Sequence, residues 1–132
     1  MGIYINHRKY LPRVADHFVS VGFELSILVT RWFIPLFSTT VNFSLLFRLW
    51  DYLFCVGFSG LFRFAIAILM ISEKTILQCD LVELSTFIHN VGTERFRRER
   101  DIQNLFDVMC SLEEVGIVET LTSLCIIHMN NL

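Results

Sequence analysis

Hydrophobic residues recur at helical spacing along most of the chain. The first such run follows Pro12 and stops at Gly22, and its apolar members lie three or four residues apart. Pro is favoured in a first helical turn and Gly just beyond the last one, so this run predicts a helix over 11–21. A second run predicts a helix over 24–37, with Pro35 bending or shortening its last turn.

The middle of the chain predicts two helices that meet at Gly57. Asn42 or Ser44 can cap the first of them, because a short polar side chain accepts hydrogen bonds from the free N–H groups of a first turn. The second, 61–71, is apolar on nearly every side except at Arg63. A helix of that kind is buried on most sides, so we expect it at the centre of the core.

Further helical segments follow this central one. Residues 72–79 either extend it or form a short separate helix. Asp80 is a predicted N-cap for a helix over 80–91, and Gly92 is its predicted stop. A final amphipathic stretch covers 113–132.

A run of charged residues begins the segment 93–112, for which we predict one helix after the glycine. The signs alternate along the run, and this pattern suits a solvated helical face with pairs such as Glu94 and Arg98. The acids nearly cancel the bases here, so the run gives little indication of a basic binding patch.

The pattern as a whole predicts an all-α fold. No alternation of strand period is long enough for a sheet, and the chain shows no internal repeat. At 132 residues it has the length of one domain or part of one. We therefore expect a multi-helix bundle with orthogonal or irregular packing.

Composition raises the question of a membrane protein. The hydrophobic fraction of 54% exceeds the value of about 45–50% usual for soluble proteins. However, Pro35 and polar residues interrupt the longest uncharged stretch, and Arg63 lies in the centre of the greasiest one. An arginine at the bilayer midplane costs at least ~2.5 kcal/mol, so we expect no integral span. Residues 1–10 lack the apolar run of a secretory signal, which favours the cytoplasm.

Local chemistry offers no active site. The sequence has no phosphate-binding glycine loop and no nucleophile elbow, and a net charge of −2 gives no electrostatic case for nucleic acid. We expect no cofactor and no metal, because the histidines are scattered apart from a weak Cys125 and His128 pair. The widely spaced cysteines are expected to be buried free thiols: Cys55, Cys79, Cys110 and Cys125.

Three blocks in order between Leu11 and Leu69 carry a family resemblance. They read LPRVADHF, GFELSILVTRWFIPLF and FRLWDYLFCVGFSGLFRFAIAIL. In this order they resemble the C-terminal half of TBC domains, helical domains that activate GTP hydrolysis by Rab GTPases. The resemblance implies a partial TBC-like domain over 11–91, with an N-terminal extension over 1–10 and additional helices over 92–132.

The residues of these blocks that match the family are expected to be structural. Aromatic members should anchor the core or helix contacts, Asp51 should pair with Arg48 or cap a neighbouring helix, and Gly57 should allow a left-handed turn. The candidate family-motif residues are Trp32, Phe37, Arg48, Trp50, Asp51 and Gly57.

The resemblance also implies what the sequence lacks. The family's catalytic arginine and glutamine stand in Ile-x-x-Asp-x-x-Arg and Tyr-x-Gln blocks upstream of everything matched, and neither block occurs in these 132 residues. An arginine finger contributes ~10³–10⁵ in rate. Arg48 and Arg63 are poor substitutes, because both stand in largely apolar helices whereas a finger must project into the partner's site. We therefore name no catalytic residue, and expect activation only if the missing upstream blocks are restored.

The resemblance favours a Rab-family GTPase as partner, with a binding or regulatory role in vesicle trafficking and a cytoplasmic location, peripheral to endomembranes. Two alternatives remain open: a small membrane-associated helical protein and a helical scaffold module. If a truncated gene or splice form has removed half of the domain, the apolar surface that faced it is exposed and favours self-association.

Overall fold

The chain is helical throughout the part that the structure describes. The computed structural model describes residues 10–130, without the side chains of 93–94, 115, 123 and 125–130, so the predicted extension 1–10 lies almost wholly outside it. Within the described part there is no strand, only an isolated bridge between Val41 and Gly92, and the predicted all-α class is confirmed. The elements are α2 (Pro12–Val21), α3 (Ser26–Leu28), the π-helix η1 (Val29–Phe33), α4 (Phe43–Val56), α5 (Ser59–Ile71), α6 (Glu73–Leu77), α7 (Leu81–Glu94), α8 (Glu99–Ser111) and α9 (Glu114–Asn130).

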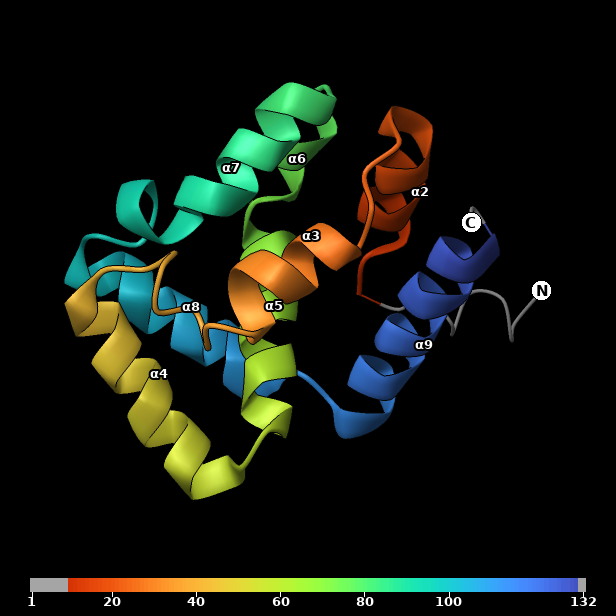
Figure 1. The fold of residues 1–132 in the computed structure, drawn as a ribbon. Coiled ribbons are helices and arrows are strands. Elements are labelled where there is room, and N and C mark those ends of the chain that lie inside the picture. Colours follow the sequence, from red (N-terminus) through yellow and green to blue (C-terminus); the bar gives the residue numbers. More distant parts are fainter. Residues whose placement is uncertain (1–9, 131–132) are drawn as a thin grey trace.

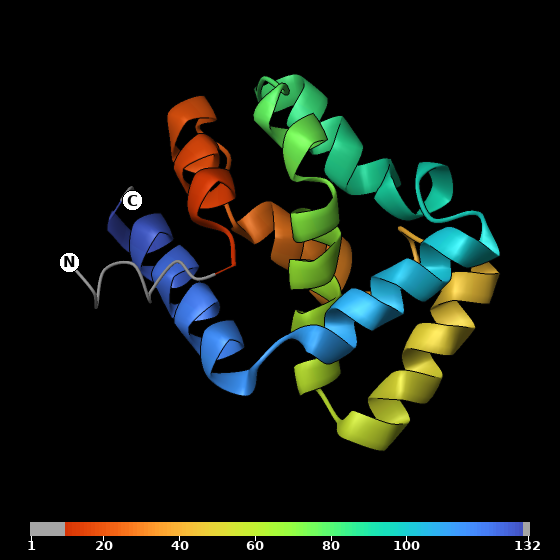
Figure 2. The ribbon, with the colours of Figure 1, turned by 180° about the vertical axis from the view of Figure 1, so that it is seen from behind.

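Helix α5 lies in the middle of the fold, as its apolar sequence predicts (Figure 1). Seen from behind, α8 crosses it diagonally, while α4 and α9 lie to either side (Figure 2). Its buried residues include Leu61, Phe64 and every position from 65 to 69. None of the described helices is both long and apolar enough to cross a bilayer.

The helix predicted over 24–37 is helical only from Ser26 to Phe33, so it ends early near Pro35, as predicted, but by more than its last turn. Helix α3 passes into η1, which ends at Phe33, and turns follow up to residue 40. Pro35 explains the end, because it has no N–H to donate to the carbonyl of Arg31 four residues before it. That carbonyl instead accepts a hydrogen bond from Thr40 Oγ1 at 3.0 Å.

The cap predicted for α4 is confirmed at Asn42 and does more than end a helix. Its Oδ1 accepts a hydrogen bond from Leu45 N at 3.0 Å. Its Nδ2 donates to the carbonyls of Gly92 and Phe96, each at 3.2 Å. One side chain therefore starts α4 and holds that start against the end of α7. Asp80 likewise caps α7, in a capping box with Glu83.

Gly92 does not stop α7, which continues to Glu94, so the predicted helix end is wrong. The glycine is buried, and a Cβ there would lie 2.2 Å from Val41 Cγ1 and 2.6 Å from Val41 Cα. Only a residue without a side chain allows this approach of two backbones. Gly92 is therefore needed for packing between segments.

The helix predicted over 93–112 is confirmed from Glu99 to Ser111, as α8, but its predicted start is wrong. Arg98 is the N-cap residue of α8, so it shares no helix with Glu94, whose side chain lies outside the described part. The charged run instead reaches other elements. Glu99 pairs with Arg48 of α4 at 2.7 Å, and the guanidinium of Arg95 lies 5.7 Å from the centre of the Phe87 ring.

Arg63, the charged residue in apolar α5, serves the junction of α8 and α9. Its Nη1 donates to the carbonyls of Met109, at 3.2 Å, and Leu112, at 2.6 Å. Its Nη2 lies 3.0 Å from a carboxylate oxygen of Glu114. A helix end leaves carbonyls without intrahelical partners, and the guanidinium satisfies them here. The arginine thus fixes where α9 begins.

Candidate functional site

Helix α4 carries a row of aromatic side chains on its outer side. Residues 43, 47, 50 and 54 are spaced four, three and four apart, which places them on one face of the helix. Phe43 is 75% exposed and Phe54 is 86% exposed, and Phe58 just beyond the helix is 75% exposed. The rings of Phe43 and Phe47 stack at a centroid distance of 6.1 Å. We call Phe43, Phe47, Trp50, Phe54 and Phe58 the aromatic face.

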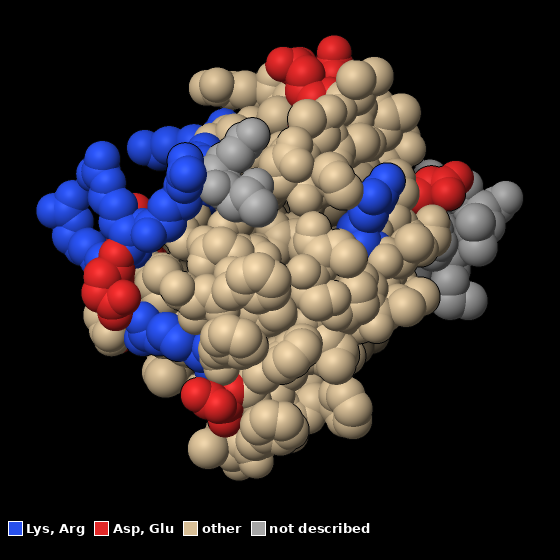
Figure 3. Space-filling view, turned by 60° about the vertical axis from the view of Figure 1, so that its left-hand side comes forward, with Lys and Arg blue, Asp and Glu red and all other residues tan. Residues whose placement is uncertain are grey.

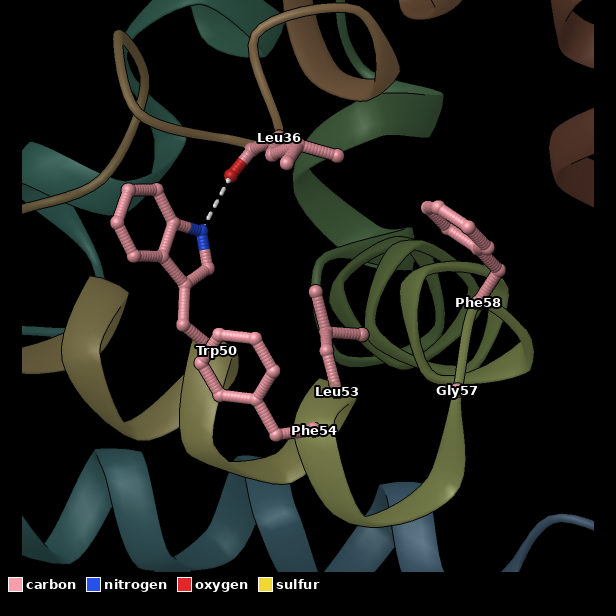
Figure 4. Close-up of a pocket in the computed structure, with 6 residues that line it drawn as sticks. All are labelled: Leu36, Trp50, Leu53, Phe54, Gly57 and Phe58. Atoms are coloured by element: carbon pink, nitrogen blue, oxygen red, sulfur yellow. Dashed lines mark hydrogen bonds between the residues drawn. The ribbon is translucent and has the colours of Figure 1, made fainter.

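A pocket of about 390 Å³ lies at the end of the aromatic face, where α4 meets α5. Figure 4 shows Trp50, Leu53 and Phe54 entering it from α4, Phe58 from the start of α5, and Leu36 from the turn above. Trp50 Nε1 donates to the carbonyl of Leu36 at 3.2 Å, so the indole is fixed at its polar end. The remaining lining residue is Gly57.

Gly57 shapes this pocket through its backbone. Its φ of +83° and ψ of −168° lie in a region that is essentially restricted to glycine. The chain turns there from α4 into α5, which brings Phe58 to the side of the pocket opposite Trp50 (Figure 4). Leu36 and Phe37 on the neighbouring turn also have positive φ, at 52° and 64°. Since side chains disfavour this conformation, the surrounding packing must hold it.

Charged groups border this region and do not enter the pocket. In the view from the side of α4 and the α7–α8 connection, uncharged side chains cover most of the surface, and the largest gathering of charged ones lies at the left-hand edge, with smaller groups at the top and toward the right (Figure 3). The pocket itself is lined by apolar residues and a glycine. It offers no acid, base or nucleophile. What it can do is take up an apolar side chain from a partner, as interface pockets do.

The structure separates the uncharged candidate residues from the sequence into two groups. Trp32 and Phe37 are fully buried in the core, 5.3 Å apart between ring centroids, and Trp32 Nε1 donates to the carbonyl of Ile88 at 2.9 Å. Trp50 and Gly57 line the pocket.

The two charged candidates lie on α4 but do not share a role. Arg48 pairs with Glu99 and lies 5.0 Å from the centre of the Phe106 ring. Asp51 is exposed.

The exposed phenylalanines were missed as site residues in the sequence. Their spacing was readable, yet the same spacing describes a helix face that is buried. Only the surface position of this side of α4 distinguishes Phe54 from a core residue such as Phe64.

The described cysteines are not the buried thiols that the sequence predicted. Cys55 and Cys110 are exposed, and Cys79 is half-buried. Each stands near a helix end or on an outer side, where an apolar sequence context does not imply burial. Burial raises the pKa of the Cys79 thiol above its ordinary value, and the carboxylates of Glu83 and Asp80 raise that pKa further.

No metal centre is found among the described residues: they contain no group of three or more potential ligands. The weak pair predicted at Cys125 and His128 lies outside the described side chains.

The chain belongs to the Rab-GTPase-TBC domain family, whose model matches residues 5–77. It is similar to a TBC domain-containing protein, C4G8.04, of Schizosaccharomyces pombe, with 27% identity over 124 residues, or 93% of this chain and 16% of the relative. It is 26% identical to the ecotropic viral integration site 5 ortholog of Drosophila melanogaster over 106 residues, covering 80% of this chain and 13% of the relative.

A third relative is growth hormone-regulated TBC protein 6 of Caenorhabditis elegans. It is 32% identical over 89 residues, covering 67% of this chain and 27% of the relative. The chain thus spans about a quarter or less of the length of these relatives.

Proposed function

We propose that this chain is a binding or regulatory part of a Rab GTPase regulator, and that its aromatic face contacts a Rab-family small GTPase. The observation that carries the proposal is the row of exposed phenylalanines on α4 in a chain that belongs to the TBC family. A contiguous exposed apolar surface of this kind is typical of an interaction site. We assign no catalytic residue to this site.

The proposal of binding without catalysis is supported by the arginines that are present. Neither finger block occurs in the 132 residues. Arg63 donates three hydrogen bonds within the α8–α9 junction. Arg48 is held between Glu99 and the Phe106 ring. Releasing either to reach a partner's phosphates would remove contacts from the fold. We therefore expect neither of these two arginines to act as a finger.

A panel of purified Rab GTPases, loaded with GDP or with a non-hydrolysable GTP analogue, tests the binding step. We expect at least one Rab to bind, and Phe54→Ser or Phe58→Ser to weaken its binding about tenfold or more, since buried aromatic residues dominate interface energies. The matched control is Val82→Ser on α7, which changes a residue of similar exposure, 74%, outside the aromatic face. The proposal is contradicted if no Rab binds. It is also contradicted if Phe54→Ser and Phe58→Ser both leave the affinity for the bound Rab unchanged.

Single-turnover GTP hydrolysis with the same panel tests the catalytic part. We expect rates within about twofold of the intrinsic rate, because a missing finger removes ~10³–10⁵ of acceleration. Strong acceleration by this chain alone would overturn the non-catalytic assignment. If it occurred, Arg48→Lys and Arg63→Lys would identify the arginine used.

We place the protein in the cytoplasm, peripheral to endomembranes and acting in vesicle trafficking. The proposed binding to a membrane-associated Rab GTPase would bring it there. Cell fractionation tests this. We expect salt to release the membrane-bound fraction, and a requirement for detergent would favour the integral membrane alternative.

Self-association through the aromatic face is a second candidate, favoured by the same exposed phenylalanines. Sedimentation across a range of concentrations tests it, with Phe54→Ser expected to shift the protein toward monomer. A monomer at all concentrations would leave heterotypic binding as the role of this face.

A further inference from the structure

A second cavity shares no lining residue with the pocket at the end of the aromatic face. It has a volume of about 540 Å³ and is formed between α3 with η1, the adjoining side of α5, and α9. Its walls are almost wholly hydrocarbon, and among the described side chains that line it only Ser26 and Thr30 carry a hydroxyl. The walls include Val29, Phe33, Phe62, Leu69 and Leu121. The size is that of a small-molecule site, and the lining suits an aliphatic chain.

A smaller cavity of different character adjoins this one. Its volume is about 380 Å³, and it is lined by Ser26, Ile27, Thr30, Arg31 and Ser85. Ser26 and Thr30 line both cavities, so the two meet along this one turn of backbone. The apolar cavity therefore adjoins, at these two hydroxyl-bearing residues, the cavity lined by the guanidinium of Arg31.

Arg31 is exposed and available at that end. Its Nη1 lies 3.1 Å from His89 Nδ1, a contact between α7 and η1 that leaves the remaining N–H donors of the guanidinium for other acceptors. Ser26 Oγ is already 3.4 Å from a carboxylate oxygen of Glu24. An anion would therefore be placed toward Thr30 and Arg31, away from Glu24.

We propose that these joined cavities bind a single-chain anionic amphiphile, with the aliphatic tail between η1, α5 and α9 and the anionic head at Arg31 and Thr30. Each methylene that enters the apolar cavity leaves water, which favours binding. A charged hydrogen bond from the guanidinium fixes the head at the polar end. The arrangement selects against neutral or short ligands, because these lose one of the two contributions. The proposal does not depend on Rab binding.

Titration calorimetry of the full chain with palmitate, kept below its aggregation concentration, tests the site. We expect saturable binding of one palmitate per chain, weaker binding of laurate and none detectable for butyrate. A neutral monoacylglycerol of the same tail length should bind about tenfold or more weakly than palmitate, the loss expected for a charged hydrogen bond.

Two pairs of variants separate the tail and head contributions. Val29→Trp fills the apolar cavity from a residue that is 46% exposed, and should lower palmitate affinity at least tenfold; Val19→Trp on α2, at 43% exposure, is its control and should not. Arg31→Gln should lower palmitate affinity about tenfold and leave the neutral lipid unaffected. Arg13→Gln on α2 is the corresponding charge control.

Several results would overturn the proposal. One is the absence of saturable palmitate binding, and another is equal affinity for palmitate and the neutral lipid. A third is binding that survives Val29→Trp but is lost in Phe54→Ser, which would place the lipid on the aromatic face. Because none of these measurements involves a GTPase, failure here leaves the proposed function untouched, and failure of Rab binding leaves this site untouched.

Discussion

The core around α5 and the aromatic face of α4 are built from the same kinds of residue and have opposite surroundings. Trp32 and Trp50 make the comparison direct, because each indole N–H donates to a backbone carbonyl, of Ile88 and of Leu36 respectively. Trp32 is fully buried, whereas Trp50 is half-buried and lines a pocket. The difference arises because Trp32, on η1, is enclosed in the core around α5, whereas α4 is packed only on its inner side (Figure 1). The indole N–H thus needs a hydrogen-bond acceptor in both regions, whereas the burial of the ring depends on which helices pack around it.

Truncating one aromatic residue in each region gives the largest expected difference in stability between the core and the aromatic face. We expect Trp32→Ala to lower the free energy of unfolding by about 3–5 kcal/mol, because it leaves a cavity in the core and removes the indole's hydrogen bond to the carbonyl of Ile88. Phe54→Ala should change it by no more than about 0.5 kcal/mol, since its ring already faces water. Urea unfolding followed by circular dichroism measures both. Equal losses would mean that the aromatic face is covered in solution.

Gly92→Ala tests whether the core tolerates any added atom between α7 and Val41. We expect a loss of about 1–3 kcal/mol from overpacking, because the new Cβ would meet backbone as well as side-chain atoms of Val41. In an ordinary helix interior the same change stabilises by about 1 kcal/mol. A thermal unfolding midpoint that stays constant or rises would show that the two backbones separate easily.

Asn42→Ala tests the connection between the two regions, since this residue starts α4 and bonds to the end of α7. We expect a loss of about 1–2 kcal/mol, typical for removal of a helix N-cap. Asn42→Asp is the informative control, because it keeps the acceptor for Leu45 N and removes the donor to Gly92 and Phe96. If Asn42→Asp is as stable as the native chain in chemical unfolding, only the cap matters.

Thiol reactivity gives the smallest effect and reports exposure in each region. At pH 8 we expect Cys55, at the exposed end of α4, to react with iodoacetamide faster than Cys79. Burial and the neighbouring acids raise the pKa of the Cys79 thiol, so less of it is thiolate at that pH. Mass spectrometry of timed samples measures the order. Faster modification of Cys79 would indicate that the contact between α2 and α6 opens readily.

Much of the fold could be predicted because its signals are local. A short polar residue before an apolar run caps a helix wherever the run folds, so Asn42 and Asp80 were readable from sequence. The extreme apolarity of 61–71 placed α5 at the centre for a similar reason, since such a helix has no face to offer water.

The errors arose where a local signal had two meanings. A glycine after an apolar run signals a helix end. Gly92 instead lies inside α7 and is needed because the backbone near Val41 and Asn42, about fifty residues away in sequence, packs directly against it. Charged residues in alternation suggested one solvated helix, whereas in the structure Glu99 pairs across to Arg48.

The candidate site was the part least accessible from the sequence. The family motif pointed to Trp50 and Gly57, which line the pocket, but also to Trp32 and Phe37, which are core. Phe47, Phe54 and Phe58 stand inside the third block of the resemblance, but were not among its candidate residues. Their positions on α4 were visible, but the side of α4 left without a neighbour was not.

The sequence by itself determined that this protein is helical, where most of its helices begin, and which family it resembles. Those properties follow from the spacing of apolar residues and from caps, which act within a few residues of one another. Only the tertiary structure decided which aromatic residues face water, why Arg63 stands in an apolar helix, and where two cavities join at Ser26 and Thr30. Exposure is set by what packs against a helix from distant parts of the chain, and no local pattern encodes that.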